Sequence, residues 1–318
     1  MAGLEYKNID ALSAHAEPDN ILARRWSAEE AFQYCERLAR AHYENFPVGS
    51  VLVPKRLRKH FYSIYAFART ADDFADEGFA DESAELSAER RLAELSEWRE
   101  QLHMAFDNKA SHPIFVALQQ TRAEFDLPVS LFDDLLSAFT QDVLARRYES
   151  FDQLLDYCRR SANPIGRLIL LLFGYRETHL HEQSDEICTA LQLANHWQDL
   201  AVDLKKDRVY LPAEDLERFK VTIDELKTGA MGANFRKLMK FEIARTRDYF
   251  FRGKPLCGAV GGRLGLELRA VWLGGWRILD RIEENDYDVF TRRPAITLSD
   301  KLGIFLGAFR KGAFLARR

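Results

Sequence analysis

The chain has 318 residues, of which 47% are hydrophobic and 30% charged, a composition typical of a folded domain rather than a disordered chain. Its 45 Lys and Arg nearly balance its 49 Asp and Glu, and the net charge of −4 argues against general nucleic-acid binding. The four cysteines are scattered, which disfavours a zinc site or a disulfide framework. We recognise neither a signal peptide nor a membrane-spanning segment, so a cytoplasmic protein is expected.

The predicted elements are helices throughout. Ser27 and Glu30 form a capping-box pattern, which starts a helix that continues to about Tyr43. Pro54 starts a longer helix that ends near Gly78. After a polar linker at 79–87, further helices are expected at residues 90–106, 113–126, 130–147, 152–162, 165–173, 184–206, 234–252, 264–284 and 298–318.

The alternation of Val and Ile that is typical of strands is almost absent from this sequence. We therefore predict an all-α fold of about ten or more helices. A single domain is expected over residues 26–318, preceded by a polar, acidic arm over residues 1–25.

A first acidic stretch follows the apolar run at residues 61–68. Asp72 and Asp76 are four residues apart, as are Asp73 and Glu77, so each pair shares one face of a helix. An unpaired carboxylate beside an apolar segment is costly to bury. Either these acids face water or a bound cation neutralises them.

A second series of polar residues has the spacing three, four, four and four, and most residues between its members are apolar. Two solvated acidic faces on surface helices would explain both stretches. Oxygen ligands without His or Cys instead favour Mg²⁺, and two such helices could hold a diphosphate through Mg²⁺ ions. The series is Gln192, Asn195, Asp199, Asp203 and Asp207.

These motifs resemble, in order and spacing, those of the squalene/phytoene synthases, which are head-to-head isoprenoid synthases. The resemblance covers about residues 30–310. It implies an all-α isoprenoid-synthase bundle with a central cavity, a prenyl diphosphate substrate and Mg²⁺, with Mn²⁺ as an alternative ion. The matching segments are Tyr65–Arg69 followed by Asp72-Asp73-x-x-Asp76, Gln192-x-x-Asn195-x-x-x-Asp199-x-x-x-Asp203, Arg208–Pro212, Tyr157–Cys158 with Gly166, and Ile278–Ile282 with Asp286–Phe290.

Three features depart from the general family pattern and are similar to the bacterial hydroxysqualene synthase branch. They are the segments His42–Pro47 and Ser161–Gly166, and Trp276 where many members carry tyrosine. This resemblance implies conversion of presqualene diphosphate and water to hydroxysqualene and diphosphate. The alternatives are presqualene diphosphate, squalene or phytoene synthase activity on two prenyl diphosphates, and a non-catalytic helical scaffold that binds cations.

The resemblance also implies roles for the matching residues. Metal binding and catalysis are expected from Asp72, Asp76, Asp199 and Asp203, with metal support from Asn195. Contacts with the diphosphate end of the substrate are expected from His42, Arg69, Gln192 and Arg208. The cavity wall is expected to include Phe46, Tyr65, Phe67, Tyr157 and Trp276, of which Tyr157 is also a catalytic candidate. The attacking water is expected near Tyr43, Asn45 and Asn163.

Several assignments stay open at this point. Arg69 could form a surface salt bridge to Asp73 instead of binding phosphate, and His42 could be structural. Asp73 and Glu77 could be metal-linked or not. Asp207 lies beyond the matched motif and is expected to cap the helix or face solvent.

The expected partners follow from the resemblance. A presqualene diphosphate synthase would supply the substrate, and a flavoenzyme would reduce the product to squalene for hopanoids. No nicotinamide-binding fingerprint is visible, in agreement with a reaction that needs no NADPH. The segment Lys301–Arg318 alternates apolar and basic residues, so it either lies on an anionic inner-membrane surface or docks on the protein.

Overall fold

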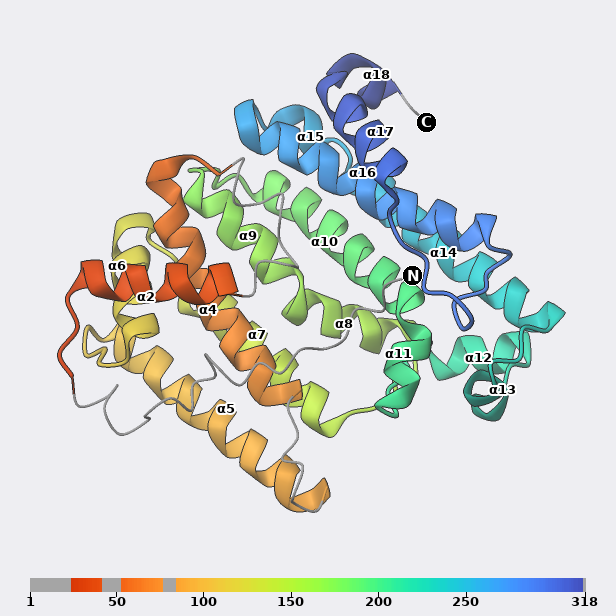
Figure 1. Cartoon of the computed structure of the whole chain (residues 1–318), viewed down its shortest axis with the longest axis horizontal. Helices are drawn as coiled ribbons and strands as arrows, with labels where there is room; N and C mark the ends of the chain where they lie inside the picture. The colour runs from red at the N-terminus through yellow and green to blue at the C-terminus, as the bar shows by residue number, and fades with distance from the viewer. Residues whose placement is uncertain (1–23, 42–52, 77–83, 317–318) are drawn as a thin grey trace. The chain divides into compact units, whose positions relative to one another are not determined.

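The computed structural model describes residues 24–41, 53–76 and 84–316, which form helices and connecting turns without a strand (Figure 1). The predicted all-α fold is confirmed. No helix among the described residues combines the length and the apolar character needed to cross a bilayer. The described helices are α2 (Ala28–Ala41), α4 (Lys55–Asp76), α5 (Ala84–Phe106), α6 (Pro113–Phe125), α7 (Val129–Leu144), α8 (Phe151–Ser161), α9 (Asn163–Leu172), α10 (Thr178–Gln198), α11 (Leu200–Lys205), α12 (Ala213–Phe219), α13 (Ile223–Thr228), α14 (Ala233–Gly253), α15 (Leu256–Ala259), α16 (Gly262–Glu284), α17 (Leu298–Phe309) and α18 (Lys311–Ala316).

The first of two compact units has an aromatic core and comprises the described residues of 24–41, 53–74 and 93–129. Phe67 and Phe115 are fully buried, and the ring of Trp98 lies 6.3 and 4.5 Å from theirs. The indole Nε1 of Trp98 donates a hydrogen bond of 3.4 Å to the carbonyl oxygen of Phe67. These contacts fix the rotation of α4, which carries the first acidic stretch.

The second compact unit comprises the described residues of 75–92 and 130–316. Its helices α10, α14 and α16 lie side by side around a buried core (Figure 1). The indole of Trp197 on α10 donates to the hydroxyl of Thr246 on α14 at 2.8 Å. Both partners of this bond are buried, so the bond fixes α10, which carries the second polar series.

Gly275 lets α16 approach both neighbours closely. A Cβ atom at this position would lie 2.5 Å from a ring carbon of Phe250 on α14 and 2.6 Å from a methyl carbon of Leu191 on α10. Close-packed interiors leave no room for such contacts. A larger side chain would therefore push these three helices apart.

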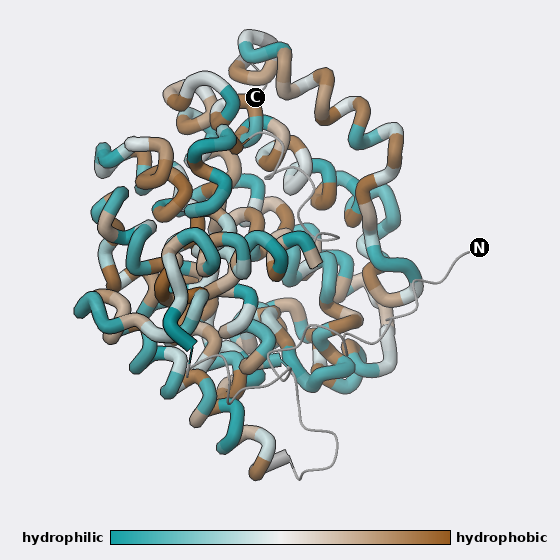
Figure 2. The backbone as a smooth tube through the Cα atoms, turned by 60° about the vertical axis from the view of Figure 1, so that its left-hand side comes forward, coloured by the Kyte–Doolittle hydropathy of each residue, from teal (hydrophilic) through white to brown (hydrophobic). Residues whose placement is uncertain are grey.

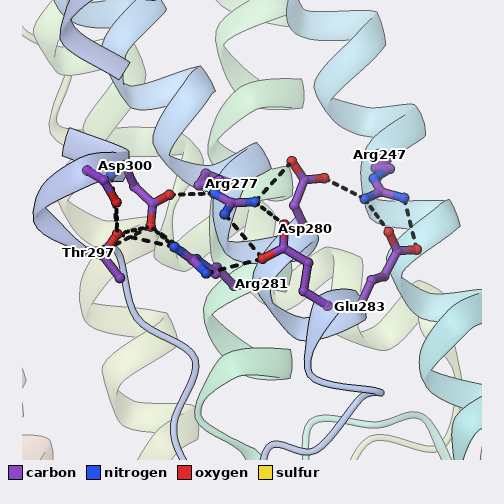
Figure 3. A network of polar contacts seen from close by, with 9 residues as sticks. Arg247, Arg277, Asp280, Arg281, Glu283, Thr297 and Asp300 are labelled. Carbon is purple, nitrogen blue, oxygen red and sulfur yellow. Dashed lines mark hydrogen bonds and ion pairs between the residues drawn. The ribbon is translucent and has the colours of Figure 1, made fainter. Parts of the chain in front are cut away.

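A network of ion pairs, which we call the Asp300 network, fastens α16 on two sides (Figure 3). Toward α14, Arg247 pairs with Glu283 at 2.6 Å. Toward α17, the carboxylate of Asp300 accepts from Arg277 and from Arg281, each at 2.7 Å. The network consists of Arg247, Arg277, Asp280, Arg281, Glu283, Glu284, Thr297 and Asp300.

The predicted capping box is confirmed, but two predicted helix starts are wrong. The box of Ser27 and Glu30 is formed. Helix α5 begins at Ala84 instead of residue 90, because a polar surface helix and a polar linker share the same composition. Helix α10 begins at Thr178 rather than at Ser184, whose buried side chain packs against Gly166 instead of capping a helix.

The expected helix over residues 184–206 is also interrupted at Asp199. This residue has φ −100° and ψ 9°, and it separates α10 from α11. The backbone N–H of Asp199 still donates to the carbonyl of Asn195, and that of Asp203 donates to Asp199, both at 2.9 Å. The three residues therefore stay one turn apart despite the interruption.

Candidate active site

Asp76 is the last residue of α4, and two cations from the segment after α11 hold its carboxylate. Lys206 Nζ lies 2.8 Å from Oδ2, and Arg208 Nη1 lies 2.8 Å from Oδ1. Burial alone would raise the pKa of Asp76, but the hydrogen bonds and charges of these two cations outweigh burial, so its pKa is lowered. Asp76 is therefore ionised at neutral pH.

Asp199 is held by a cation from the loop between α16 and α17. Arg293 donates to both carboxylate oxygens of Asp199, with Nη2 at 3.0 Å from Oδ2. The neighbouring side chain of Gln198 donates to the carbonyl oxygen of Pro294 at 2.6 Å. These contacts fasten the α16–α17 loop to the end of α10.

Asp203 lies one turn beyond Asp199, and its pKa is raised to about 7. Burial is the largest cause, and the negative charges of Asp199 and Asp76 add to it. The positive charges of Arg208 and Lys206 oppose this shift without cancelling it. Three carboxylates therefore interact here, and burial keeps Asp203 partly protonated at neutral pH.

The donor chemistry of this cluster fits Mg²⁺, although its side chains are not arranged around an ion. All three acids offer oxygen ligands, which hard divalent cations prefer. Within the part of the chain that the structure describes, no group of three or more His, Cys, Asp or Glu side chains is positioned to hold a metal. The carboxylates instead point at cations of the protein: Asp76 pairs with Lys206 and Arg208, and Asp199 pairs with Arg293. A metal would have to replace these partners.

The earlier part of the first acidic stretch belongs to the first compact unit. Arg69 lies 2.5 Å from Asp73 and 3.4 Å from Asp72, so the alternative salt bridge of Arg69 is present. The pKa of Tyr65, one turn earlier on α4, is raised by burial and by the nearby carboxylates, although Arg69 lowers it. Asp72 lies one turn before Asp76 on the same helix.

Tyr157 is connected to the acidic cluster through a residue that the sequence did not indicate. Its hydroxyl donates to the carboxylate of Asp142 at 2.8 Å, and Arg208 donates to the backbone carbonyl of Asp142 at 3.2 Å. Burial raises the pKa of Tyr157 well above its usual value, and the charge of Asp142 adds to the shift. Asp142 belongs to no motif, so only its contacts identify it.

An aromatic cluster surrounds Tyr157. The ring of His196 stacks on that of Tyr210 at 3.7 Å. The ring of Tyr157 lies 5.6 Å from that of Tyr148 and 5.9 Å from that of Tyr210, and the rings of Tyr148 and Tyr210 are 5.6 Å apart. His196 is only 3% exposed, and burial lowers its pKa to about 3, so the imidazole is neutral. Neither ring nitrogen has a hydrogen-bond partner among the described residues. We define this set, Tyr148, Tyr157, His196 and Tyr210, as the aromatic cluster.

Sequence reasoning missed His196, Lys206 and Arg293 as well. His196 stands inside the second polar series, between Asn195 and Asp199, and its position there was a usable signal. Lys206 precedes the Arg208 motif by two residues. Arg293 lies almost a hundred residues from Asp199 in sequence, and nothing in its local pattern pointed to that contact.

The other predicted site residues have varied surroundings. On α10, Gln192 is half-buried and Asn195 is exposed. Trp276 stacks on Trp272 at 4.9 Å, and the amide of Asn163 accepts from Thr189 at 3.1 Å. Four predicted residues and one undecided acid lie outside the described residues, namely His42, Tyr43, Asn45, Phe46 and Glu77.

Asp207 faces solvent, which is one of the two environments expected for it. It has a positive φ of 55°, and its carboxylate lies 2.7 Å from Arg147 and 3.5 Å from Arg146. The side chain is half exposed, so it faces solvent as predicted, but it joins two segments rather than capping a helix. These arginines lower the pKa of Asp207.

A family model described as squalene/phytoene synthase matches residues 39–300 of this chain. The chain belongs to the squalene/phytoene synthase family. A hydroxysqualene synthase of Zymomonas mobilis subsp. mobilis is 35% identical over 72% of this chain and 75% of that protein. A phytoene synthase of Arthrospira platensis is 28% identical over 86% of this chain and 90% of that protein. The crystal structure of squalene synthase HpnC from Alicyclobacillus acidocaldarius matches with a TM-score of 0.76 and 41% identity, covering 82% of this chain and 96% of that one.

Family membership fixes the class of chemistry. The chain is a head-to-head isoprenoid synthase with the isoprenoid-synthase fold, and members of this family typically depend on Mg²⁺. Its substrates are prenyl diphosphates. The alternative of a non-catalytic scaffold is set aside.

Proposed function

We propose that this squalene/phytoene synthase family member converts presqualene diphosphate and water to hydroxysqualene and diphosphate. The observation that carries the proposal is the ranking of identities among relatives. The chain is 41% identical to squalene synthase HpnC and 35% identical to a hydroxysqualene synthase, against 28 and 31% to two phytoene synthases. The departures at His42–Pro47, Ser161–Gly166 and Trp276 support the same branch.

The acidic residues have a defined task in this proposal. The ligands of Mg²⁺ would be the side chains of Asp72, Asp76, Asn195, Asp199 and Asp203. When bound, Mg²⁺ neutralises the diphosphate and so makes it a better leaving group.

The cations that now hold the carboxylates have a second task. Arg208, Lys206 and Arg293 must exchange their partners when Asp76 and Asp199 bind a metal. Their N–H groups then donate to the oxygens of the diphosphate, for which guanidinium is well suited. Gln192 and Arg69 are proposed to add further donors to the same group.

The bonds and protons balance without a reductant. The C–O bond to the diphosphate breaks, and the electron pair leaves with the diphosphate. The cyclopropylcarbinyl cation rearranges to an allylic cation, which a water oxygen attacks. The proton lost by that water passes to the departing diphosphate, and no hydride is needed.

The aromatic cluster is suited to a cation of this kind. The face of Tyr157 carries negative quadrupole density, and its hydroxyl is not ionised at neutral pH because burial raises its pKa well above the usual value. The ring of Tyr210, next to it, is already stacked on those of His196 and Tyr148. The cation would be stabilised without a nucleophilic phenolate that could capture it.

His196 is our candidate for the residue that holds the attacking water. It is buried, and its two ring nitrogens have no partner among the described residues, which leaves one donor and one acceptor for a water molecule. We expect His196→Phe to keep presqualene diphosphate consumption within about tenfold while shifting the products from the alcohol to dehydrated hydrocarbons. An unchanged alcohol fraction, measured by gas chromatography with mass spectrometry, would remove His196 from this role.

A reconstitution experiment tests the function itself. The purified protein is incubated with Mg²⁺ and presqualene diphosphate, farnesyl diphosphate or geranylgeranyl diphosphate, always without NADPH, and the products are identified. Hydroxysqualene from presqualene diphosphate alone is the expected result. Presqualene diphosphate formed from farnesyl diphosphate would instead place the chain at the preceding condensation step.

Phytoene synthase activity is the second candidate. The specific observation in its favour is coverage, because the phytoene synthase relative aligns with 86% of this chain and the hydroxysqualene synthase relative with 72%. Phytoene formed from geranylgeranyl diphosphate in the same experiment would decide for this candidate.

The proposed reaction also defines its neighbours in metabolism. Presqualene diphosphate must come from an enzyme that condenses two farnesyl diphosphates. Hydroxysqualene must lose its hydroxyl group to give squalene, a reduction that we assign to a flavoenzyme. Both steps and the present one are proposed to occur in the cytoplasm or at the inner face of the membrane.

A further inference from the structure

Helix α17 exposes a stripe of large apolar side chains to solvent. Leu298, Leu302, Phe305, Leu306 and Phe309 have exposed fractions of 84, 61, 58, 51 and 57%. Their spacing of four, three, one and three residues places all five on one face of the helix. Figure 2 shows the hydrophobic colouring along this helix near the C-terminus. We call these five residues the α17 stripe.

The stripe is not the face that attaches α17 to the protein. On the opposite face, Ala308 is fully buried and its carbonyl accepts a hydrogen bond of 2.6 Å from Arg269 on α16. A Cβ at Gly307 would lie 3.1 Å from Leu273 of α16. The Asp300 network fixes the first turn of α17 in addition. The helix is therefore docked through one face while the stripe points away.

Basic residues flank the stripe. Lys301 and Arg310 are exposed and lie on opposite sides of it by helical spacing, and Lys311 follows at once. From Leu298 to the end of the sequence there are five Lys or Arg and one acid, in a chain that carries a net negative charge overall. That acid is Asp300, whose charge Arg277 and Arg281 already compensate.

We infer that α17 binds to the surface of an anionic lipid bilayer, with the stripe inserted among the acyl chains and the flanking cations at the headgroups. The helix has 12 residues, too few to span a bilayer, so it would lie in the plane of the interface. Water-exposed apolar side chains gain most by this transfer, and anionic headgroups complement the cations.

The charge pattern favours lipid over a second copy of the chain. A two-fold pairing of two stripes would bring Lys301 and Arg310 of one copy close to the same cations of the other. Like charges at such a contact repel each other, and the segment lacks enough acids to compensate them. An anionic bilayer offers the complementary charge along the whole stripe.

Vesicle binding by the full-length protein tests the inference, and it requires no catalytic turnover. Binding to vesicles of phosphatidylcholine with phosphatidylglycerol is measured by co-sedimentation and compared with phosphatidylcholine alone. We expect binding to the anionic vesicles that weakens at high salt. The double variant Phe305→Ser/Phe309→Ser should lower the vesicle partition coefficient by about tenfold or more, because two inserted rings are lost.

Two further variants complete the design. Leu144→Ser is the matched control, because Leu144 is 65% exposed at the end of α7 in the same compact unit and has no place in the stripe. It should leave vesicle binding unchanged. Lys301→Glu/Arg310→Glu should remove the preference for anionic vesicles while leaving circular dichroism unchanged, since both side chains are exposed.

Three results would overturn the inference. The first is equal vesicle binding by the wild type and the Phe305→Ser/Phe309→Ser variant. The second is equal binding of the wild type to zwitterionic and anionic vesicles. The third is a wild-type dimer in sedimentation velocity that this variant abolishes, without vesicle binding by either protein, which would assign the stripe to a second copy.

Discussion

Two groups of carboxylates and cations in the second compact unit differ in the pKa of one carboxylate, Asp300 in the first group and Asp203 in the second. In the Asp300 network, the carboxylate of Asp300 accepts from Arg277, from Arg281 and from the backbone N–H of Thr297 (Figure 3). Burial opposes ionisation, but these donors outweigh it, and the pKa of Asp300 is far below its usual range. Each charge in this contact has its partner.

In the candidate active site, one carboxylate has the opposite pKa shift. Asp76 takes Lys206 and Arg208, and Asp199 takes Arg293, which leaves Asp203 with a pKa raised to about 7. The same residue types therefore give a fully ionised carboxylate in one place and, in the other, a buried carboxylate that is only partly ionised at neutral pH. The charge of a bound divalent cation would favour the ionised form of Asp203.

The largest expected effect is the loss of turnover when this cation site is broken. Asp199→Ala, and equally Asp72→Ala, should reduce kcat by about a thousandfold or more. Each removes a proposed ligand of the Mg²⁺ that would neutralise the departing diphosphate in the transition state. Helical content measured by circular dichroism should stay as in the wild type. Wild-type rates in either variant would contradict the metal assignment.

The next effect concerns stability rather than activity. Asp300→Asn leaves Arg277 and Arg281 without their carboxylate in a largely buried contact, so we expect a loss of about 2 kcal/mol in the free energy of unfolding. Urea denaturation gives this value. Asp286→Asn is the matched control, because its pair with Arg236 is exposed and should contribute less than about 0.5 kcal/mol. Equal losses in the two variants would show that the ion pairs of Asp300 contribute no more to stability than the exposed pair of Asp286 with Arg236.

Local sequence pattern was sufficient for most of the helices. Capping residues and Pro54 marked helix starts within one or two residues, and the spacing of Asp199 and Asp203 correctly placed them one turn apart. Ser184 misled, because a serine that packs against Gly166 looks the same in sequence as a serine that caps a helix. The polar composition of residues 79–87 predicted a linker, but a polar surface helix has the same composition and α5 begins at Ala84.

The partners of the acidic residues were beyond local pattern. Arg293 meets Asp199, and Asp142 meets Tyr157, because the tertiary fold brings separate helices and loops together. Charge balance is a sum over such neighbours, so the raised pKa of Asp203 could not be predicted from spacing. The motifs located the acids, and only the contacts and the burial distinguish Asp76, which two cations keep ionised, from Asp203, whose pKa is raised.

A smaller effect should appear in the pH dependence of stability. The pKa of Asp203 is raised from 3.8 to about 7, so the folded protein keeps a proton that the unfolded chain releases near pH 4. The contribution of Asp203 to stability is thus complete below about pH 4 and is lost as the pH rises through about 7. Asp300, with a lowered pKa, has the opposite sign: its contribution exists above pH 4 and is lost in acid.

Asp203→Asn separates these two contributions. In protein without divalent cations, this variant should be about 1–2 kcal/mol more stable than the wild type near pH 8 and about as stable as the wild type near pH 4. The difference at pH 8 is set at about 1–2 kcal/mol because solvent screens the charge at this half-buried site. Urea midpoints at several pH values measure the difference. A constant difference across this pH range would show that Asp203 does not titrate as described.

The smallest expected effect is on metal affinity. Arg293 competes with a metal for Asp199 through an ion pair that is half exposed on the arginine side. Such a pair contributes up to about 1 kcal/mol, so Arg293→Ala should tighten Mg²⁺ binding by about threefold. Isothermal titration with Mg²⁺ in the absence of substrate measures this change.

Arg281→Ala is the control, because it removes a guanidinium from the Asp300 network instead. It should leave Mg²⁺ affinity unchanged although it lowers the free energy of unfolding. If Arg293→Ala weakened Mg²⁺ binding, Arg293 would support the metal site rather than compete with the metal for the carboxylate of Asp199.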